Sequence, residues 1–364
     1  MAARFHDLVV ERVREVAADA VAVRLAVPAP VRERFRHLPG QYLTLRAEID
    51  GEEVRRAYSI CSPTDGAPPA SLEVGIRRVP GGRFSTRAAA LRPGDALAAM
   101  PPEGRFVARP GTPTRAVLIA AGSGITPCLS IATSLLEGHE GARVTLLYGN
   151  RGLDGIMFRA ELDALKDRHL ERFSLLHATS REPRDVALLN GRVSADMVAA
   201  LVARGLLDPD AADGTWLCGP RPMIEGVGAW LAERGVAPER VHRELFAAVP
   251  GGAPPSPASG AARSGGAGPQ AGATVHVTID GTRRRLLVDG ARETVLAAAA
   301  RQGLELPHSC AGGMCCTCRC RVVAGEATMD ANYSLERWET EAGFVLACQA
   351  RPVGTMLELD FDAS

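Results

Sequence analysis

The stretch Pro307-His308-Ser309-Cys310-Ala311-Gly312-Gly313-Met314-Cys315-Cys316-Thr317-Cys318 decides how the rest of the chain is interpreted. Three of its cysteines follow the spacing C-x4-C-x2-C, and Cys348 supplies a distant fourth thiol. This spacing is typical of a plant-type 2Fe-2S cluster, whose two irons take four thiolates in two pairs. The adjacent glycines suit such a loop, because glycine tolerates positive φ and close backbone approach. The predicted cluster ligands are Cys310, Cys315, Cys318 and Cys348.

A structural zinc site is the alternative for a set of four cysteines. Zinc ligands usually come as paired knuckles of the form C-x2-4-C. This chain instead has one triplet and one lone cysteine, which favours the cluster. The remainder of the chain then has to explain where the electrons for such a cluster come from.

Length and composition set limits on the rest. The chain has 364 residues, enough for two or three domains, and 46% of them are apolar. Its formal net charge is zero, which argues against a nucleic acid as partner. It has no run of about 18 apolar residues, so we expect no membrane span. Six of the nine cysteines lie at 310–348, around one motif, and together with the lack of an apolar signal sequence they indicate a reducing cytoplasm.

Residues 1–112 are expected to form an antiparallel β-barrel domain. Short apolar or alternating runs at 21–25, 42–45 and 72–76 are separated by turn signals such as Asp50-Gly51. Regular short strands of this kind are typical of an antiparallel barrel.

Two segments of this region have the residue types that a flavin needs. A flavin requires a cation for its phosphates, a flat side chain against its ring and a hydrogen-bonding group near the ring edge. Arg56, Tyr58 and Ser59 can supply these, and a strand places Arg56 and Tyr58 on one face. The segment Gly81-Gly82-Arg83-Phe84-Ser85-Thr86 could hold a pyrophosphate with backbone N–H groups and a hydroxyl. The alternative for the first segment is an ordinary strand, and the alternative for the second is a surface hairpin turn.

Residues 113–247 change to an α/β pattern, for which we expect a parallel sheet. The strand 116–121 leads directly into Gly122-Ser123-Gly124-Ile125-Thr126-Pro127 and then into a helix. A strand, a glycine turn and a helix N-terminus form a cradle that favours a phosphate. The segment is not a full G-x-G-x-x-G fingerprint, because Pro127 stands where the last glycine would be.

Two further strands, 143–148 and 173–178, end in polar residues. Arg151 follows the first strand, and Ser180 and Arg181 follow the second. Ligands bind at the carboxyl ends of parallel strands, and an arginine there suits the 2′-phosphate of NADP. These residues therefore favour NADPH over NADH. The alternative is that they are ordinary loop residues exposed to solvent.

A fourth strand, 214–217, leads into Cys218-Gly219-Pro220. Cys218 is either a buried core thiol, which is the commoner case for a free cysteine, or a residue beside the nicotinamide. Hydride transfer itself does not need catalysis by a thiolate.

The end of the chain reads as a linker and a third domain. Residues 248–273 are almost all Ala, Gly, Pro and Ser, the composition of a flexible linker that lets the last domain visit donor and acceptor. Residues 274–364 are expected to form an α+β ferredoxin domain. A hairpin around Asp280-Gly281 precedes a helix at 294–303 that ends at glycine, and the ligand loop follows.

Three of these motifs resemble those of the ferredoxin–NADP reductase superfamily. Arg56-Ala57-Tyr58-Ser59 is similar to its flavin motif, residues 122–127 to its nucleotide motif, and Cys218-Gly219-Pro220 to its third signature. The order of flavin domain, nucleotide domain and plant-type ferredoxin resembles that of oxygenase reductases. The resemblance covers essentially the whole chain, including Asn332-Tyr333-Ser334-Leu335-Glu336, whose chemistry the sequence does not explain. It implies FAD, NADPH and a 2Fe-2S cluster as cofactors, and a β-grasp fold for the ferredoxin domain.

The resemblance also implies roles for individual residues. Arg56 would bind the flavin phosphate, Tyr58 would stack on the isoalloxazine, and Ser59 would lie near the reactive ring nitrogen. Cys218 joins Tyr58 and Ser59 as the third implied catalytic residue, and Phe246 would close the flavin site. The implied cofactor-binding set is Arg56, Tyr58, Ser59, Gly82, Phe84, Ser85, Gly122, Gly124, Thr126, Pro127, Arg151, Ser180, Arg181, Gly219 and Phe246.

The chain departs from the family's pattern at Cys316, where relatives have a small residue between the ligands. Cys316 could perturb the cluster or offer an alternative thiolate. Cys320 is also extra, although a cysteine there is familiar in this subgroup.

The resulting hypothesis is a converter of hydride to single electrons. NADPH would give two electrons to FAD at once, and these would pass singly to the cluster and then to an oxygenase component. The resemblance implies a di-iron oxygenase that epoxidises phenylacetyl-CoA. A Rieske oxygenase or another monooxygenase is the alternative acceptor. A non-catalytic last domain, serving as a redox-responsive interaction module, is an alternative of a different class.

Overall fold

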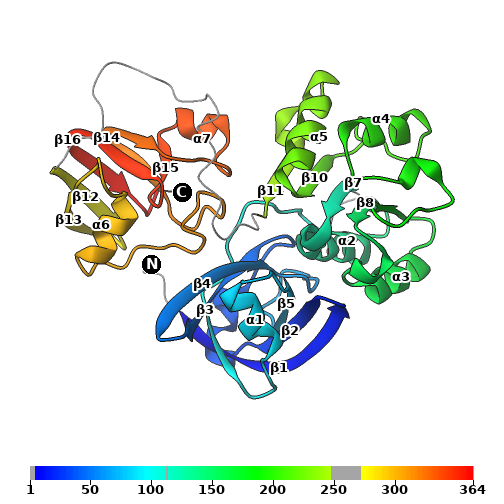
Figure 1. Cartoon of the computed structure of the whole chain (residues 1–364), viewed down its shortest axis with the longest axis horizontal. Helices are drawn as coiled ribbons and strands as arrows, with labels where there is room; N and C mark the ends of the chain where they lie inside the picture. Colours follow the sequence, from blue (N-terminus) through cyan, green and yellow to red (C-terminus); the bar gives the residue numbers. More distant parts are fainter. Residues whose placement is uncertain (1–4, 112–113, 247–271, 364) are drawn as a thin grey trace. The chain divides into compact units, whose positions relative to one another are not determined.

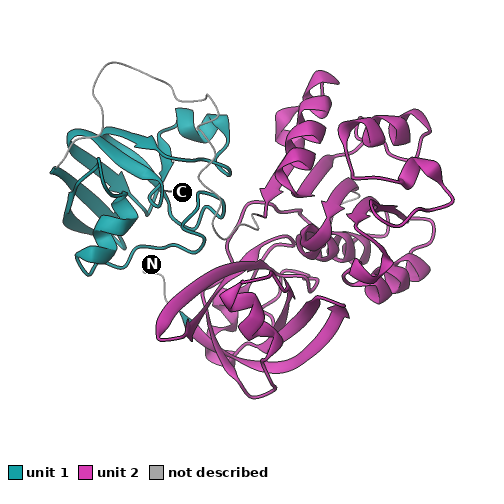
Figure 2. Cartoon of the chain, viewed as in Figure 1, with its two compact units in different colours: residues 1–5, 249–364 teal, residues 6–248 magenta. Residues whose placement is uncertain are grey.

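The computed structural model describes residues 5–111, 114–246 and 272–363. Contacts divide the chain into two compact units (Figure 1, Figure 2). The larger unit spans residues 6–248, and most of the smaller unit is residues 249–364. The linker predicted at 248–273 lies outside the described residues, apart from its last two.

The first part of the larger unit is an antiparallel barrel. Its strands are β1 (His6–Ala17), β2 (Ala20–Ala26), β3 (Tyr42–Ile49), β4 (Glu52–Ser59), β5 (Ser71–Arg77) and β6 (Ala96–Ala99). They pair in the order β4-β3-β6-β1-β2-β5, and each neighbouring pair is antiparallel. An antiparallel bridge between Ile60, just after β4, and Val74 of β5 closes the sheet. The predicted barrel is therefore confirmed.

Side-chain alternation explains these strands. Leu8 and Val10 of β1 are buried between exposed neighbours, as expected of a strand with one face on a core. Helix α1 (Arg83–Ala89) adds Phe84 and Ala88 to the same core. The segment around Gly82, for which the sequence left open a phosphate-binding turn or a hairpin turn, is a turn that starts this helix.

The second part of the larger unit is a parallel sheet, as predicted. Its strands are β7 (Arg115–Ala121), β8 (Arg143–Asn150), β9 (Phe173–Thr179), β10 (Gly214–Gly219) and β11 (Val241–Leu245). They lie in the order β11-β10-β7-β8-β9, and all neighbours are parallel. The sequence analysis found four of these strands and missed β11, which is only five residues long.

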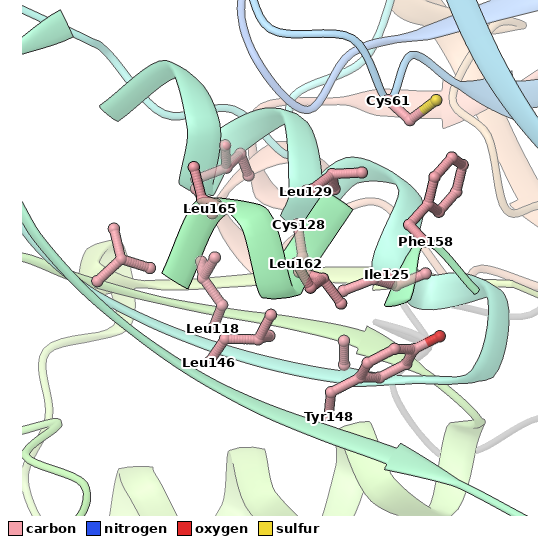
Figure 3. Packing of buried hydrophobic residues seen from close by; sticks show 14 of the residues in the cluster. Cys61, Leu118, Ile125, Cys128, Leu129, Leu146, Tyr148, Phe158, Leu162 and Leu165 are labelled. Carbon is pink, nitrogen blue, oxygen red and sulfur yellow. The ribbon is translucent and has the colours of Figure 1, made fainter. Parts of the chain in front are cut away.

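Helices cover both faces of this sheet. One buried cluster contains residues of α2 (Ile125–Gly138) and α3 (Arg159–Arg168), and another contains residues of α4 (Ala195–Ala203) and α5 (Arg221–Glu233). Figure 3 shows the first cluster, in which Leu129 of α2 and Leu118 of β7 share a core with Cys61 of the barrel (Figure 3). The barrel and the nucleotide domain are thus packed together through α2. No helix in the described part of the chain is long and apolar enough to cross a membrane.

Short 3-10 helices complete the larger unit. They are η1 (Ala29–Phe35), η2 (Gly122–Gly124), η3 (Leu153–Gly155), η4 (Ala187–Leu189) and η5 (Pro238–Arg240). Of these, η2 lies between β7 and α2, so the glycine turn predicted to hold a phosphate is a tight turn.

The smaller unit holds a five-stranded mixed sheet in the order β13-β12-β16-β14-β15. Its elements are β12 (Ala273–Ile279), β13 (Thr282–Val288), α6 (Val295–Arg301), β14 (Arg319–Met329), α7 (Arg337–Glu341), β15 (Phe344–Leu346) and β16 (Ala350–Asp360). Strands β12 and β16 are parallel, and the other pairs are antiparallel. This is the α+β fold predicted for the ferredoxin domain.

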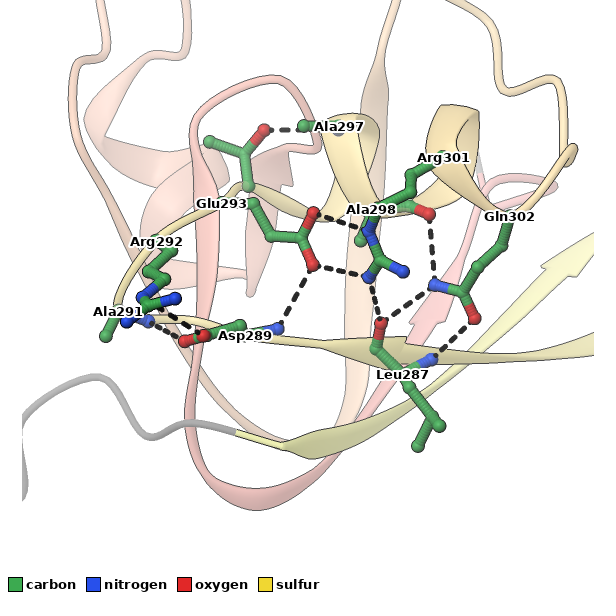
Figure 4. A network of polar contacts seen from close by, with 10 residues as sticks. Leu287, Asp289, Ala291, Arg292, Glu293, Ala297, Ala298, Arg301 and Gln302 are labelled. Carbon is green, nitrogen blue, oxygen red and sulfur yellow. Dashed lines mark hydrogen bonds and ion pairs between the residues drawn. The ribbon is translucent and has the colours of Figure 1, made fainter.

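Helix α6 is tied to the edge strand β13. The hydroxyl of Thr294 accepts from the Ala297 N–H and caps the helix start. At its end, the Arg301 guanidinium pairs with Glu293 at 2.6 Å, and Gln302 exchanges two hydrogen bonds with the backbone of Leu287 (Figure 4). These contacts fix the end of α6, after which the ligand loop begins.

Candidate functional site

The strand order reverses at β7: the chain continues from β7 through β8 to β9 on one side, and then crosses to β10 on the other side of β7. Open α/β sheets bind ligands at such a reversal. The loops after β7 and β10 touch there. A Cβ on Gly124 would lie 2.1 Å from the carbonyl oxygen of Cys218, and Gly122 has a φ of +58°. Gly219 is less tightly constrained, since its Cβ would lie 2.8 Å from the movable Met223 methyl group and 3.2 Å from the Ala121 backbone nitrogen. These glycines bring the two predicted nucleotide segments together.

The first turn of α2 faces the barrel. The hydroxyl of Thr126 donates to the Ser123 carbonyl at 3.0 Å, and both Thr126 and Pro127 are buried. A Cβ on Gly75 of β5 would lie 2.6 Å from the Thr126 methyl group. The Thr126 and Pro127 side chains therefore position the loop between the domains, while Gly122 remains partly accessible.

The end of β4 presents the predicted flavin residues. The rings of Tyr58 and Phe84 lie 5.4 Å apart, and Phe84 belongs to the barrel core. Burial raises the pKa of the Tyr58 hydroxyl. Arg56 is exposed and donates to the Arg55 carbonyl at 2.7 Å, which leaves most of its guanidinium N–H groups available. Phe84 therefore supports the Tyr58 ring from the core side.

The turn before α1 is held by Ser85. Its hydroxyl accepts from the Val79 N–H at 3.1 Å and donates to the Gly82 carbonyl at 3.2 Å. A Cβ on Gly82 would lie 2.5 Å from the Ser85 oxygen, so this position requires glycine. The Ser85 hydroxyl thus shapes the turn whose backbone N–H groups were predicted to bind a pyrophosphate.

Three side chains from distant segments meet where the barrel joins the nucleotide domain. The Ser59 hydroxyl donates to the Glu244 carboxyl at 3.5 Å, and Glu244 of β11 pairs in register with Cys218 of β10. Burial raises the pKa of Glu244 to about 8, and the hydrogen bond from Ser59 partly offsets this. Burial and the nearby Glu244 raise the pKa of the Cys218 thiol. Burial thus favours the neutral forms of both the carboxyl and the thiol.

Glu244 was not among the predicted site residues. Its signal in the sequence is the short segment Val241-His242-Arg243-Glu244-Leu245, too brief to identify as a parallel strand by pattern. Phe246, which follows it, is partly buried and packs against the core beneath α2. The two residues are therefore placed by β11, which the sequence analysis did not find.

The polar ends of β8 and β9 lie side by side. The Arg181 N–H donates to the Arg151 carbonyl at 2.8 Å, and the Ser180 N–H donates to the Asn150 carbonyl at 3.0 Å. Both arginine side chains are exposed. Two arginines and a serine hydroxyl at the carboxyl end of a parallel sheet are suited to a phosphate monoester.

In the smaller unit, the four predicted ligand thiols lie in two pairs. Cys310 is hydrogen-bonded to Cys315, and Cys318 is hydrogen-bonded to Cys348. Among the residues that the structure describes, no group of three or more His, Cys, Asp or Glu side chains closes on a single ion. Two thiol pairs fit a cluster with two irons better than one tetrahedral zinc.

Hydrogen-bond donors surround these sulfurs. The N–H groups of Gly312 and Met314 each donate to the Cys310 sulfur at 3.4 Å, and the Gln349 amide donates to the Cys348 sulfur at 3.5 Å. The Cys315 thiol and these two N–H groups lower the pKa of Cys310. Hydrogen-bond donors directed at the cysteine sulfurs are typical of iron–sulfur sites, so the loop fits the predicted cluster.

The two extra cysteines occupy different environments. Cys316 has a φ of +59°, which explains why a small residue is preferred there, and its thiol contacts the Ser334 hydroxyl. Cys320 is fully buried on β14, with its sulfur 3.8 Å from the Val345 carbonyl. Each thiol therefore has a polar partner of its own.

Comparison with known proteins agrees with this site. Three family models match in the predicted order: an oxidoreductase FAD-binding domain over residues 7–107, an oxidoreductase NAD-binding domain over 118–228, and a 2Fe-2S iron-sulfur cluster binding domain over 277–353. These domains together define an NAD(P)H-dependent flavin and iron–sulfur oxidoreductase. The predicted enzyme class, FAD and the 2Fe-2S cluster are confirmed.

Individual relatives indicate which kind of oxidoreductase this is. The chain is 39% identical to a component of the 1,2-phenylacetyl-CoA epoxidase of Escherichia coli, over 99% of this chain and 98% of that protein. It is 32% identical to the ferredoxin reductase component of 3-ketosteroid-9-alpha-monooxygenase from Rhodococcus rhodochrous, over 97% and 96%. The solved structure of phthalate dioxygenase reductase has the same fold, with a TM-score of 0.58 at 22% identity over 98% of each chain. The chain belongs to the ferredoxin–NADP reductase superfamily, among the reductase components of multicomponent oxygenases.

Proposed function

We propose that this protein oxidises NADPH and delivers the electrons singly to the oxygenase component of a phenylacetyl-CoA epoxidase. The observation that carries this choice of acceptor is the 39% identity to the Escherichia coli epoxidase component over nearly the full length of both chains. FAD, when bound, supplies the chemistry that divides a hydride into single electrons. The residues of the chain bind, orient and shield the groups that react.

The barrel residues would hold the flavin. Exposed Arg56 is available for its phosphates, and the Tyr58 ring, supported by Phe84, offers a flat surface. The turn at Gly82, fixed by the Ser85 hydroxyl, presents backbone N–H groups for the pyrophosphate. The support for this assignment is that each group lies on β4 or at the start of α1, on the wall of one barrel.

Ser59, Cys218 and Glu244 would surround the hydride transfer. The Ser59 hydroxyl lies at the end of β4, beside the loops of β7 and β10, where the nicotinamide of a bound nucleotide has to reach the flavin. The raised pKa of Glu244 favours its protonated form, which adds no negative charge beside Ser59. Burial raises the pKa of the Cys218 thiol, so Cys218 would act here by filling space beside the nicotinamide and not as a thiolate. Phe246, packed beside them, is positioned to cover the flavin.

The nucleotide would lie across the carboxyl ends of β7, β8 and β9. Gly122, which has room beside it, would let the phosphates approach the backbone. Gly124 and Gly219 would hold the two loops together, with Thr126 and Pro127 holding the start of α2. Arg151, Ser180 and Arg181 would bind the 2′-phosphate, which supports NADPH over NADH.

The cluster would be held by Cys310, Cys315, Cys318 and Cys348, and its acceptor would be a di-iron oxygenase. The relative in 3-ketosteroid-9-alpha-monooxygenase, at 32% identity, supports a second candidate, in which the acceptor is the oxygenase of another monooxygenase. We place the protein in the cytoplasm, because none of the nine cysteines, all of which lie in the described part of the chain, forms a disulfide.

A reconstituted oxygenation assay tests the acceptor. Purified oxygenase component of a phenylacetyl-CoA epoxidase is mixed with NADPH and phenylacetyl-CoA, with and without this chain, and the epoxide is measured by mass spectrometry. Epoxide that depends on the chain supports the proposal. NADPH consumption that yields only peroxide would show a working reductase and contradict the proposed acceptor, and the steroid monooxygenase component would then be tested in the same assay.

A further inference from the structure

The segment 330–335, here called the strap, runs alongside the ligand loop and is anchored at both ends. At its start, the Asp330 carboxylate pairs with the Arg351 guanidinium at 2.8 Å. In its middle, the side-chain oxygen Oδ1 of Asn332 accepts from the N–H groups of Ser334 and Leu335, at 3.2 and 2.8 Å. Leu335 is buried at its end. The strap is therefore a rigid element whose position the fold determines.

The strap contacts the ligand loop at Gly313. A Cβ on Gly313 would lie 3.0 Å from the Ala331 carbonyl oxygen, and Gly313 has a φ of +78°. The Tyr333 N–H and the Ser334 hydroxyl both donate to the Gly313 carbonyl, at 3.0 and 3.2 Å. One carbonyl of the ligand loop thus accepts two hydrogen bonds from the strap.

Cys316 also contacts the strap, through Ser334. Its sulfur lies 2.9 Å from the Ser334 oxygen. A hydroxyl has a single proton, which Ser334 gives to Gly313, so its lone pair is left to accept from the Cys316 S–H. The polar contact of this extra cysteine therefore leads back to the same Gly313 carbonyl.

The Gly313 carbonyl belongs to the same planar peptide group as the Met314 N–H. That N–H donates to the Cys310 sulfur at 3.4 Å. Donors at the carbonyl of a peptide polarise it and strengthen the donation by its N–H, because hydrogen bonds in a chain reinforce one another. A continuous chain of hydrogen bonds therefore runs from Cys316 through Ser334 and the 313–314 peptide to Cys310.

We propose that Cys316 and Ser334 are positioning residues that raise the reduction potential of the 2Fe-2S cluster through this chain. Hydrogen bonds to the cysteine sulfurs set the potential of such clusters, since they stabilise the extra negative charge of the reduced form. The inference rests on the proposed ligand role of Cys310. It gives a chemical reason for the segment Asn332 to Glu336 and for Cys316, neither of which the sequence explained.

A redox titration of the full holoprotein, followed by the EPR signal of the reduced cluster, tests the proposal. Ser334→Ala should lower the equilibrium constant for cluster reduction about threefold to tenfold, which is about 30 to 59 mV at 59 mV per tenfold for one electron. Ser334→Thr keeps the hydroxyl and should retain the wild-type potential. Cys316→Ala should shift the potential in the same direction by less. Thr340→Ala, which removes an exposed hydroxyl on α7, serves as the matched control.

The double variant distinguishes a chain from two separate effects. In a Ser334→Ala background, Cys316→Ala should cause no further shift, because its contact with the loop is already broken. A wild-type potential in Ser334→Ala at full cluster content, or a full additive shift in the double variant, would overturn the proposal. If Ser334→Ala fails to hold a cluster, an unchanged potential in Cys316→Ala would overturn it instead.

Cys310→Ser separates this inference from the ligand assignment. Loss or spectral alteration of the cluster in that variant supports Cys310 as ligand, and the potentials of the strap variants then decide the proposal alone. A Cys310→Ser protein with the native EPR spectrum and potential would show that the ligand set is wrong, and with it the end point of the chain.

Discussion

The region proposed for hydride transfer, here called the hydride region, and the ligand loop of the cluster, here called the cluster loop, are formed in different ways. Ser59, Cys218 and Glu244 of the hydride region come from three strands, and the contact between Ser59 and Glu244 joins residues 185 positions apart. The cluster loop takes three of its four proposed ligands from 310–318 and surrounds them mainly with backbone N–H groups. The first region therefore depends on how two domains pack, and the second on one loop conformation. Substitutions should affect the two regions in correspondingly different ways.

The largest expected effect is loss of the cluster in a variant that keeps the hydride region working. Cys348→Ser removes one of the four thiolates and should abolish the cluster EPR signal and electron delivery to the oxygenase. NADPH oxidation with a dye that accepts electrons from the flavin should remain, because the residues proposed to bind NADPH and FAD lie in the other unit. Anaerobic reduction by NADPH, followed by EPR and visible absorption, measures both.

Cys320→Ala is the control for that variant. Its thiol is buried and lies 3.8 Å from a carbonyl, away from the ligand pairs, so cluster content should be retained. A normal cluster signal in Cys348→Ser would refute the ligand assignment.

The next effect tests the packing of the hydride region. Gly124→Ala places a Cβ 2.1 Å from the Cys218 backbone, so the two loops must separate. We expect a loss of about 1–3 kcal/mol in stability, as for other overpacked sites, and a higher KM for NADPH. Urea denaturation and steady-state dye reduction measure the two.

Gly226→Ala is a matched control of opposite sign. Gly226 lies within α5 with no atom near the added Cβ, so alanine should stabilise the protein by about 0.5–1 kcal/mol. Equal destabilisation by both variants would mean that the close approach at Gly124 is not what requires glycine.

A smaller effect is expected at the edge of the nucleotide site. Arg181→Ala should lower kcat/KM for NADPH about tenfold and leave NADH nearly unchanged, since a charged hydrogen bond to the 2′-phosphate would be lost. Arg204→Ala, an exposed arginine after α4, is the control. An equal loss with both nucleotides would argue against a 2′-phosphate site at Arg181.

The last prediction concerns pH. Burial raises the pKa of Glu244 to about 8 from an ordinary value of 4.5, so its protonated form contributes stability that is fully present below pH 4.5. That contribution is lost as the pH rises toward 8, because the unfolded chain ionises first. The Tm of Glu244→Gln, relative to wild type, should therefore rise between pH 5 and about pH 8, whereas Glu239→Gln, at an exposed site, should show no such trend. A constant difference across this range would contradict the raised pKa.

The sequence carried more information about the cluster loop than about the hydride region. The spacing of Cys310, Cys315 and Cys318 reflects a ligand geometry that a short loop has to satisfy, so the motif and the fold of its domain were predictable. The strands β7 to β10 were also predictable, because buried parallel strands are continuous apolar runs. Ser59 was predicted from its neighbours, but Glu244 was missed because β11 is too short to produce a pattern.

Sequence alone thus determined the order of three domains, the type of cluster and the class of electron transfer, since each depends on residues close together in the chain. Tertiary structure decided which side chains meet: Glu244 with Ser59 and Cys218, and Cys316 with Ser334 and the Gly313 carbonyl. The physical reason is that a pKa or a hydrogen-bond chain depends on burial and on distances of a few ångströms. These are fixed only when segments far apart in the chain pack against one another.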